Sequence, residues 1–171
     1  MTRLRAHRRS ILRLIVVCAL VLPASFARAS TKKVTAADWF TASERCIMRE
    51  INTIRGRHGL KRLKWDVHLG FVARRHAKGM AEVRGMYHDE GLAQKVTRWR
   101  SLAQNTGKGR PCKKIMESFM GSQVHRANIL GDWEFIGVGT QWRGHRLYVQ
   151  QIFERGRNPG NIYHRPGTGG H

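Results

Sequence analysis

One histidine of this 171-residue sequence, His125, has a type and a setting that suggest chemistry. His125 lies in the stretch SQVHRANILGDWEFIGVGTQW, residues 122–142, where an arginine, a short apolar segment and an alternating glycine-rich strand follow it. An imidazole can bind a metal ion or exchange a proton near neutral pH. It can equally cap backbone groups where a helix turns into a strand, so the position alone leaves both interpretations open.

Other patterns exclude several kinds of catalytic site. No serine lies in a G-x-S-x-G elbow. Gly137 and Gly139 alternate within a strand that no helix follows, which excludes a dinucleotide-binding loop and instead predicts close backbone packing. His76 falls in the apolar stripe of an expected helix, where a buried, hydrogen-bonded histidine is the ordinary interpretation.

The N-terminal 29 residues have the three-part layout of an export signal peptide. Arginines precede an apolar run at residues 14–22, and small residues at Ala27 and Ala29 mark the expected cleavage site, after Ala29. The apolar run is shorter than the roughly 20 residues needed to span a bilayer. We therefore expect a secreted, extracytoplasmic protein with no transmembrane helix, exported by the general or the twin-arginine route, with a linker at residues 30–42.

Two cysteines remain after the expected cleavage, Cys46 and Cys112. An even number of cysteines in an exported chain predicts a disulfide. On the chain-entropy account, a bond closing a loop of about 65 residues contributes about 4 kcal/mol. Zinc is the weaker alternative, because neither cysteine has a second ligand at a close spacing.

The chain is strongly basic, with 32 lysines and arginines against 11 acidic residues and a formal net charge of +21. Loss of the signal peptide would remove six arginines and leave about +15. Such a charge predicts attraction to polyanions, including anionic envelope polymers and lipid headgroups. Nucleic acid is disfavoured, because the basic runs lack the interleaved aromatic residues of a base-stacking platform.

The apolar periodicity predicts helices first and an antiparallel hairpin last, which is typical of an α+β or a layered α/β/α fold. We expect a helix N-capped by Ser43, a short extended segment at 60–65, a helix capped by Asp66, a shorter helix at 92–99, a loop at 101–111, a helix after Pro111, strands at 135–142 and 147–153, and a flexible, basic, Gly/Pro-rich tail at 155–171.

The order of several motifs resembles a bacterial CAP domain, the superfamily of cysteine-rich secretory proteins, antigen 5 and pathogenesis-related proteins, often called the SCP domain. The motifs are INTIRGRHGLKRLKWD, VARRHAKGMAE, MYHDEGL, LAQNTGKG, SFMGSQVHRANILGDWEFIGVGTQW and LYVQQIF. HRANIL followed by IGVG is the most specific of them. The resemblance covers residues 43–154 and implies an α-β-α sandwich with a central antiparallel sheet in a protein that is usually exported.

The resemblance also implies a cleft. Family members commonly line it with two histidines and two glutamates, and the histidine pair holds a divalent metal in some of them. Matched by motif, the histidines are His88 and His125, the first glutamate falls at Gln104 and the second near Ser122, so both acids are absent here. The expected cleft residues are His88, Gln104, Asn105, Ser122 and His125, with His88 and His125 as the ligands if a metal such as zinc binds.

The missing acids weaken an enzymatic interpretation. A pair of imidazoles gives zinc two ligands where catalytic sites ordinarily have three, and the Gln104 amide cannot act as a general base. Asp89, Glu90 and Glu117 are the acids that could substitute. The favoured interpretation is a secreted or envelope-associated binding protein with a histidine-lined cleft for a small or lipid-like ligand and a basic surface for anionic envelope material. The alternative is a metal-assisted hydrolase acting on peptide or ester bonds.

Overall fold

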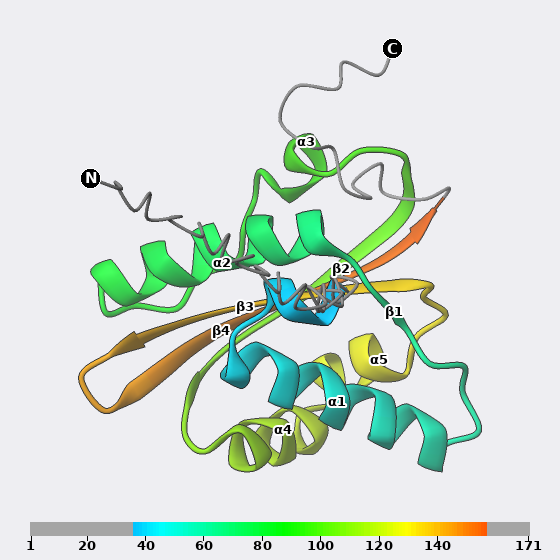
Figure 1. Ribbon diagram of the computed structural model, residues 1–171, viewed down its shortest axis with the longest axis horizontal. Coiled ribbons are helices and arrows are strands. Elements are labelled where there is room, and N and C mark those ends of the chain that lie inside the picture. The colour runs from blue at the N-terminus through cyan, green and yellow to red at the C-terminus, as the bar shows by residue number, and fades with distance from the viewer. Residues whose placement is uncertain (1–35, 157–171) are drawn as a thin grey trace, which may run out of the picture. The chain divides into compact units, whose positions relative to one another are not determined.

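The computed structural model describes residues 36–156 of the chain, in three layers. A four-stranded sheet lies between α2 on one face and α1, α4 and α5 on the other (Figure 1). In chain order the elements are η1 (Ala36–Trp39), α1 (Ala42–Arg57), β1 (Lys64–Trp65), α2 (Val67–Glu82), α3 (Leu92–Lys95), β2 (Trp99–Gly109), α4 (Cys112–Gly121), α5 (Gln123–Leu130), β3 (Phe135–Arg143) and β4 (Arg146–Gly156). The expected α-β-α sandwich is confirmed.

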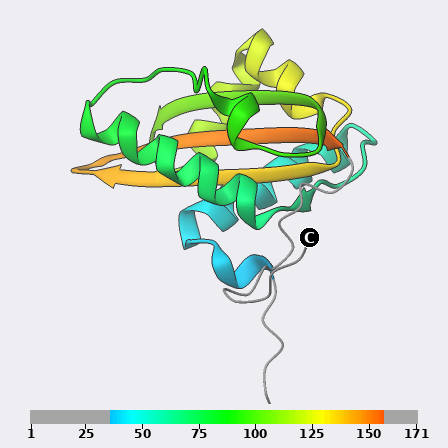
Figure 2. The ribbon, with the colours of Figure 1, turned by 90° about the horizontal axis from the view of Figure 1, so that it is seen from above.

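The sheet has the order β1-β3-β4-β2, and its three long strands are antiparallel, as Figure 2 shows from above. The short strand β1 pairs in parallel with β3 over Lys64 and Trp65 only. The sheet is therefore antiparallel in its long strands, as expected, and mixed only through the two-residue β1. Because β1 is so short, most of β3 forms one edge of the sheet and β2 forms the other.

Helix α1 begins two residues before the expected position, with Thr41 rather than Ser43 as its N-cap. The Glu44 backbone N–H donates to Thr41 Oγ1 at 3.2 Å, and the Thr41 N–H donates back to the Glu44 carboxylate at 2.8 Å. This reciprocal capping box fixes the start of the helix. The same carboxylate accepts bonds from the Arg74 side chain and the Thr140 N–H, and so joins α1 to α2 and β3.

Helix α2 packs directly on β3, and two glycines make this approach possible. Asp66 caps α2 as expected, accepting from the Leu69 N–H at 2.8 Å. A Cβ on Gly137 would lie 2.3 Å from the Leu69 backbone carbon, and one on Gly139 would lie 2.0 Å from the Arg74 nitrogen. The IGVG motif is therefore a close-packing device, as the sequence predicts.

Three expectations about the middle of the chain are corrected. The segment expected as a loop at 101–111 is mostly strand β2, paired with β4 from end to end. Helix α3 stops at Lys95, and Trp99 already begins β2. The residues after α4 form a second short helix, α5, so His125 lies within a helix rather than at a helix-to-strand junction.

A disulfide joins Cys46 in α1 to Cys112 at the start of α4, across 66 residues, which confirms the predicted pairing. At the C-terminal end, β4 includes Arg155 and Gly156, which were expected to belong to the tail. The predicted signal peptide, most of the linker and the rest of the tail lie outside the described residues. Within the described range, no helix is both long and apolar enough to cross a membrane.

Candidate functional site

Two consecutive residues of β2, Gln104 and Asn105, point into opposite layers because side chains alternate along a strand. The Gln104 Oε1 atom accepts from Gln150 Nε2 at 2.9 Å, on the face that α2 covers. The Asn105 Nδ2 atom donates to Gln151 Oε1 at 2.9 Å, on the face that α4 and α5 cover. The two amides therefore serve different parts of the site.

Gln104 holds the loop that carries His88. Its Oε1 atom accepts from the Asp89 N–H, and its Nε2 atom donates to the Asp89 carbonyl, both at 3.0 Å. On the other side of His88, the carbonyl of Tyr87 accepts from the buried ring of His76 at 2.8 Å. His88 thus lies between two anchored neighbours, and its own side chain is exposed.

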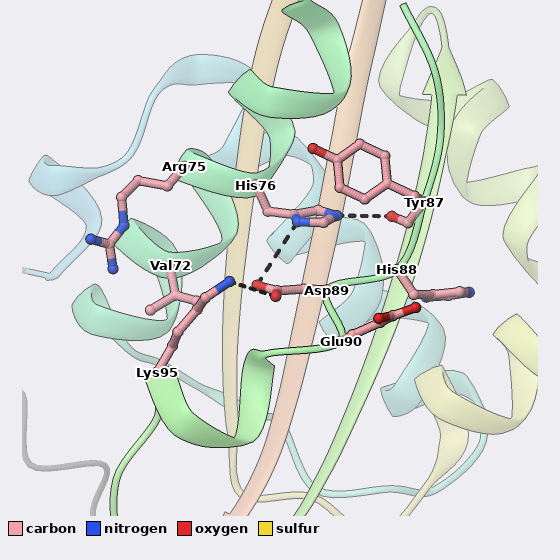
Figure 3. A pocket seen from close by; sticks show the side chains of 8 residues that line it. All are labelled: Val72, Arg75, His76, Tyr87, His88, Asp89, Glu90 and Lys95. Carbon is pink, nitrogen blue, oxygen red and sulfur yellow. Dashed lines mark hydrogen bonds and ion pairs between the residues drawn. The ribbon is translucent and has the colours of Figure 1, made fainter. Parts of the chain in front are cut away.

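His76 is buried and hydrogen-bonded, as predicted, and it also belongs to the wall of a pocket. The pocket, shown in Figure 3, has a volume of about 740 Å³. Its lining comes from α2, from the loop after α2 and from α3: Val72, Arg75, His76, Tyr87, His88, Asp89, Glu90 and Lys95. The wall combines cations, acids and imidazoles around a small apolar patch, a lining suited to a polar ligand.

The Asp89 carboxylate forms the inner wall of this pocket. Its side chain is buried, and its Oδ1 atom accepts from Lys95 Nζ at 2.5 Å. Its Oδ2 atom has no hydrogen-bond partner and lies 3.8 Å from His76 Nδ1, too far for a direct hydrogen bond. Asp89 therefore ties α3 to the His88 loop through Lys95.

His125 lies in the first turns of α5, with its ring 5.0 Å from that of Phe119. The backbone carbonyl of His125 accepts from Asn105 Nδ2 at 3.1 Å. Burial lowers the pKa of the His125 imidazole below its ordinary value, and the nearby His88 lowers this pKa further. Both effects favour the neutral form of His125.

The remaining predicted residue, Ser122, lies at the junction of α4 and α5. Its carbonyl accepts from the Arg126 N–H at 2.8 Å, which starts α5. Its hydroxyl makes no capping hydrogen bond to that helix.

The three substitute acids are placed differently. Asp89 and Glu90 line the His88 pocket, and Asp89 is already paired with Lys95. Glu117 lies on the exposed face of α4, paired with Lys114 at 2.7 Å, and lines another hollow between α1 and α4. Glu117 is therefore not part of the His88 pocket.

Three pocket residues, Arg75, Tyr87 and Lys95, were not predicted from the sequence. Arg75 precedes His76 on α2, and Tyr87 precedes His88, so their closeness to the two histidines in sequence was the available signal. Lys95 gave no such signal, because only the turn of the chain into α3 brings it to Asp89. The Asn128 side chain donates to the Gln104 carbonyl at 3.2 Å and also to Asn105 Oδ1 at 2.8 Å.

The donor set offers little support for a metal centre. His88 and His125 supply two imidazole nitrogens, and the other predicted cleft residues are neutral amides and a hydroxyl, where zinc prefers imidazole, thiolate or carboxylate. Over residues 36–156, no group of three histidine, cysteine, aspartate or glutamate side chains is arranged to hold an ion. A zinc ion held by His88 and His125 would therefore have two protein ligands, one fewer than catalytic zinc sites ordinarily have.

The three-layered sandwich is the fold expected of an SCP-type domain, and comparison of the sequence supports this class. Residues 48–153 match the profile of the Cysteine-rich secretory protein family, CAP. The chain belongs to this family.

Two solved structures show the fold. An outer surface protein from Borrelia burgdorferi superposes with a TM-score of 0.61 at 16% identity, over 66% of this chain and 92% of its own. An extracellular SCP-domain protein from Bacillus anthracis gives a TM-score of 0.58 at 24% identity, over 66% of this chain and 40% of its own.

Among curated proteins, the uncharacterized membrane protein YlbC of Bacillus subtilis is 28% identical over 128 residues. The match includes 67% of this chain but 35% of YlbC, so the chain spans about a third of that relative.

Proposed function

We propose that this protein is an exported CAP-domain binding protein whose ligand site is the pocket beside His88, extended toward His125 and Ser122. The pocket of about 740 Å³ carries the proposal. It is large enough for a small polar ligand or the end of a polymer, and it places Arg75 and Lys95 beside Asp89 and Glu90. Such a lining recognises a ligand through both charge signs and hydrogen bonds.

The hydrogen bonding of Gln104 favours binding over hydrolysis. Where relatives commonly have a glutamate, this amide is engaged with both backbone groups of Asp89 and with Gln150. It has no ionisable proton to exchange, and its bonds hold the His88 loop in place. Position 104 thus supports the shape of the pocket rather than a proton transfer.

The basic charge supports attachment to anionic envelope material. The formal charge of +21 attracts polyanions, and an exported protein would meet anionic polymers at the envelope. The test is sedimentation of the purified protein with isolated envelope polymer and with phosphatidylglycerol vesicles, at low salt and in molar salt. We expect retention that falls steeply with salt, because exposed charges are screened. Retention that salt does not change would contradict an electrostatic attachment.

The His88 pocket is tested separately, with substitutions that leave the net charge unchanged. His88→Ala removes the exposed ring at the pocket mouth, and His145→Ala, at the exposed tip of the β3–β4 hairpin, is the matched control. We expect His88→Ala to weaken binding of soluble envelope fragments in calorimetry and His145→Ala to leave it unchanged. Equal binding by both variants would place the ligand elsewhere.

A metal-assisted hydrolase is the second candidate, favoured by the lowered pKa of His125, which keeps its metal-binding neutral form at pH 7. Calorimetric titration with zinc tests it, together with hydrolysis of a chromogenic ester and of a peptide. Saturable zinc binding and hydrolysis that a His88→Ala, His125→Ala double variant loses would establish this candidate. Without zinc binding, the pocket functions with its protein groups alone.

A further inference from the structure

A second surface, outside the His88 pocket, lies along α2 beside β3. We call it the α2–β3 groove and define it by Phe71, Arg75, Lys78, Gln141 and Trp142. It consists of two hollows, of about 460 Å³ and about 240 Å³, which share Lys78 and Gln141. Figure 1 shows why they adjoin, since the C-terminal half of α2 runs beside the β3–β4 hairpin.

The groove runs along the axis of α2 because its lining residues follow the spacing of helical turns. Phe71, Arg75 and Lys78 lie at i, i+4 and i+7 of α2, so they form one exposed stripe spanning about 10 Å. Beyond Lys78 the lining passes to β3 at Gln141 and Trp142. This end of β3 lies at the sheet edge, because β1 pairs only with Phe135 and Ile136. A linear molecule can therefore lie along the groove.

Large aromatic rings are exposed at both ends of the groove. Phe71 is 44% exposed at one end and Trp142 is 47% exposed at the other. Trp39 packs edge-on against Phe71 with ring centroids 6.3 Å apart, and the Arg74 guanidinium lies over the Phe71 ring. Rings in such a setting offer flat apolar surfaces for a ligand to pack on.

Basic side chains line the groove between the two rings. Arg74, Arg75 and Lys78 line one hollow and Arg143 lines the other, against a single acid, Glu82. Arg74 already forms an ion pair with Glu44. The Lys78–Glu82 ion pair is 3.8 Å long and both of its side chains are more than half exposed, so it contributes little to stability and leaves Lys78 available to a ligand. The groove therefore suits a chain that carries repeated negative charges.

We propose that the α2–β3 groove binds an acidic polysaccharide, with sugar faces packed on Phe71 and Trp142 and carboxylates paired with Arg75 and Lys78. Gln141 supplies an amide for the hydroxyls. Arg75 also lines the His88 pocket, so a bound chain passes that side chain on its way toward His88. The choice of an extracellular polymer rests on the proposed function.

Two other polyanions fit the groove less well. A bilayer is flat and contacts protruding groups, whereas these cations line hollows. Single-stranded nucleic acid stacks successive bases on neighbouring aromatic rings, whereas here the stretch between Phe71 and Trp142 is lined by charged and amide side chains.

The test is calorimetric titration of the purified protein with three polymers. Polygalacturonate carries sugar faces and carboxylates, poly-L-glutamate carries carboxylates alone, and dextran carries sugar faces alone. We expect polygalacturonate to bind most tightly and dextran not to bind. Equal affinity for polygalacturonate and polyglutamate would overturn the role of the rings, and stronger binding of phosphatidylglycerol vesicles or oligothymidylate would overturn the choice of ligand.

Matched variants locate the binding. Trp142→Ser should weaken polygalacturonate binding about tenfold. The control is Trp99→Ser, because Trp99 is 41% exposed at the other edge of the sheet, and this variant should bind polygalacturonate as the native protein does. Arg75→Gln with Lys78→Gln should weaken binding about tenfold, beyond the effect of Lys108→Gln with Lys113→Gln, which removes the same charge elsewhere. Equal effects within either pair would overturn the proposal.

One variant separates this proposal from the proposed function. His88→Ala changes the pocket but not the groove, so it should retain at least most of the polygalacturonate affinity. Loss of binding in His88→Ala, with Trp142→Ser unaffected, would place the polymer in the pocket and reject the groove. All substituted side chains in this test are exposed or half-buried, and thermal unfolding of each variant checks that the fold is intact.

Discussion

Replacing Gln104 by glutamate tests the account of how the His88 loop is held. The amide both accepts from the Asp89 N–H and donates to the Asp89 carbonyl, at 3.0 Å each, while Gln150 donates to the same Gln104 oxygen at 2.9 Å. A carboxylate can keep the two bonds that it accepts. It cannot donate, so its second oxygen would face the Asp89 carbonyl oxygen, and two acceptors would oppose each other in a partly buried place.

The magnitude follows from these bonds. Losing one net hydrogen bond costs about 1 kcal/mol, and leaving a partly buried carbonyl without a donor adds about 1 to 2 kcal/mol. We therefore expect Gln104→Glu to lower the free energy of unfolding by about 2 to 3 kcal/mol at neutral pH. A protonated carboxyl donates again, so the difference from the native protein should shrink in acid.

The assay is urea unfolding of both proteins at neutral and acidic pH, with amide hydrogen exchange of residues 87–91 as the local readout. Gln94→Glu makes the same chemical change at an exposed position of α3 and serves as the control. If Gln104→Glu and Gln94→Glu have equal effects at neutral pH, or if acid does not reduce the difference, the donor role of Gln104 is refuted. Faster exchange confined to the His88 loop would support it.

Two further predictions concern buried positions. The Glu154 carboxyl is fully buried without a hydrogen-bond partner, and burial, with Asp66 and Glu134 nearby, raises its pKa to about 7. The native state therefore retains a proton that the unfolded chain releases above pH 4.5. As the pH rises from 4.5 to about 7, the free energy of unfolding falls by up to about 3 kcal/mol because of this group. Urea unfolding across this range should show the fall in the native protein and in Glu90→Gln but not in Glu154→Gln. Gly139→Ala should destabilise by about 3 kcal/mol or more, because its Cβ would meet the α2 backbone at 2.0 Å. Gly56→Ala is the control, because a Cβ at this position of α1 would have no atom within 4 Å, and it should stabilise the protein by about 0.5 to 1 kcal/mol. Similar urea midpoints for the two alanine variants would contradict the close packing of α2 on β3.

The sequence predicted the parts of the fold that local chemistry determines. The Asp66 cap, the apolar stripe of α2 and the β3–β4 hairpin all follow from side-chain type and spacing within one element. The disulfide was also predictable, because only Cys46 and Cys112 remained to pair. The family resemblance then supplied the order of the layers, which periodicity alone left open.

The two missed elements have physical reasons. Strand β2 has few apolar residues and two glycines, so its segment reads as a loop. Its stability comes from long-range pairing with β4 and from buried amides, which a local pattern does not reveal. A Cβ on Gly107 would lie 2.7 Å from the Phe119 ring, so a residue typical of turns here makes room for α4. Helix α5 is short and has a single buried residue, Ile129, which gives no apolar stripe.

The candidate site shows most clearly what a motif can and cannot predict. The motif places Gln104 and Asn105 side by side and suggests that both amides serve one ligand. Strand alternation separates them: Gln104 holds the loop before and after His88, whereas Asn105 holds the backbone of His125. One strand thus positions each histidine through a different amide, on opposite faces of the sheet. Because β2 is fixed along its whole length by β4, the relative placement of His88 and His125 depends on the sheet rather than on either loop alone.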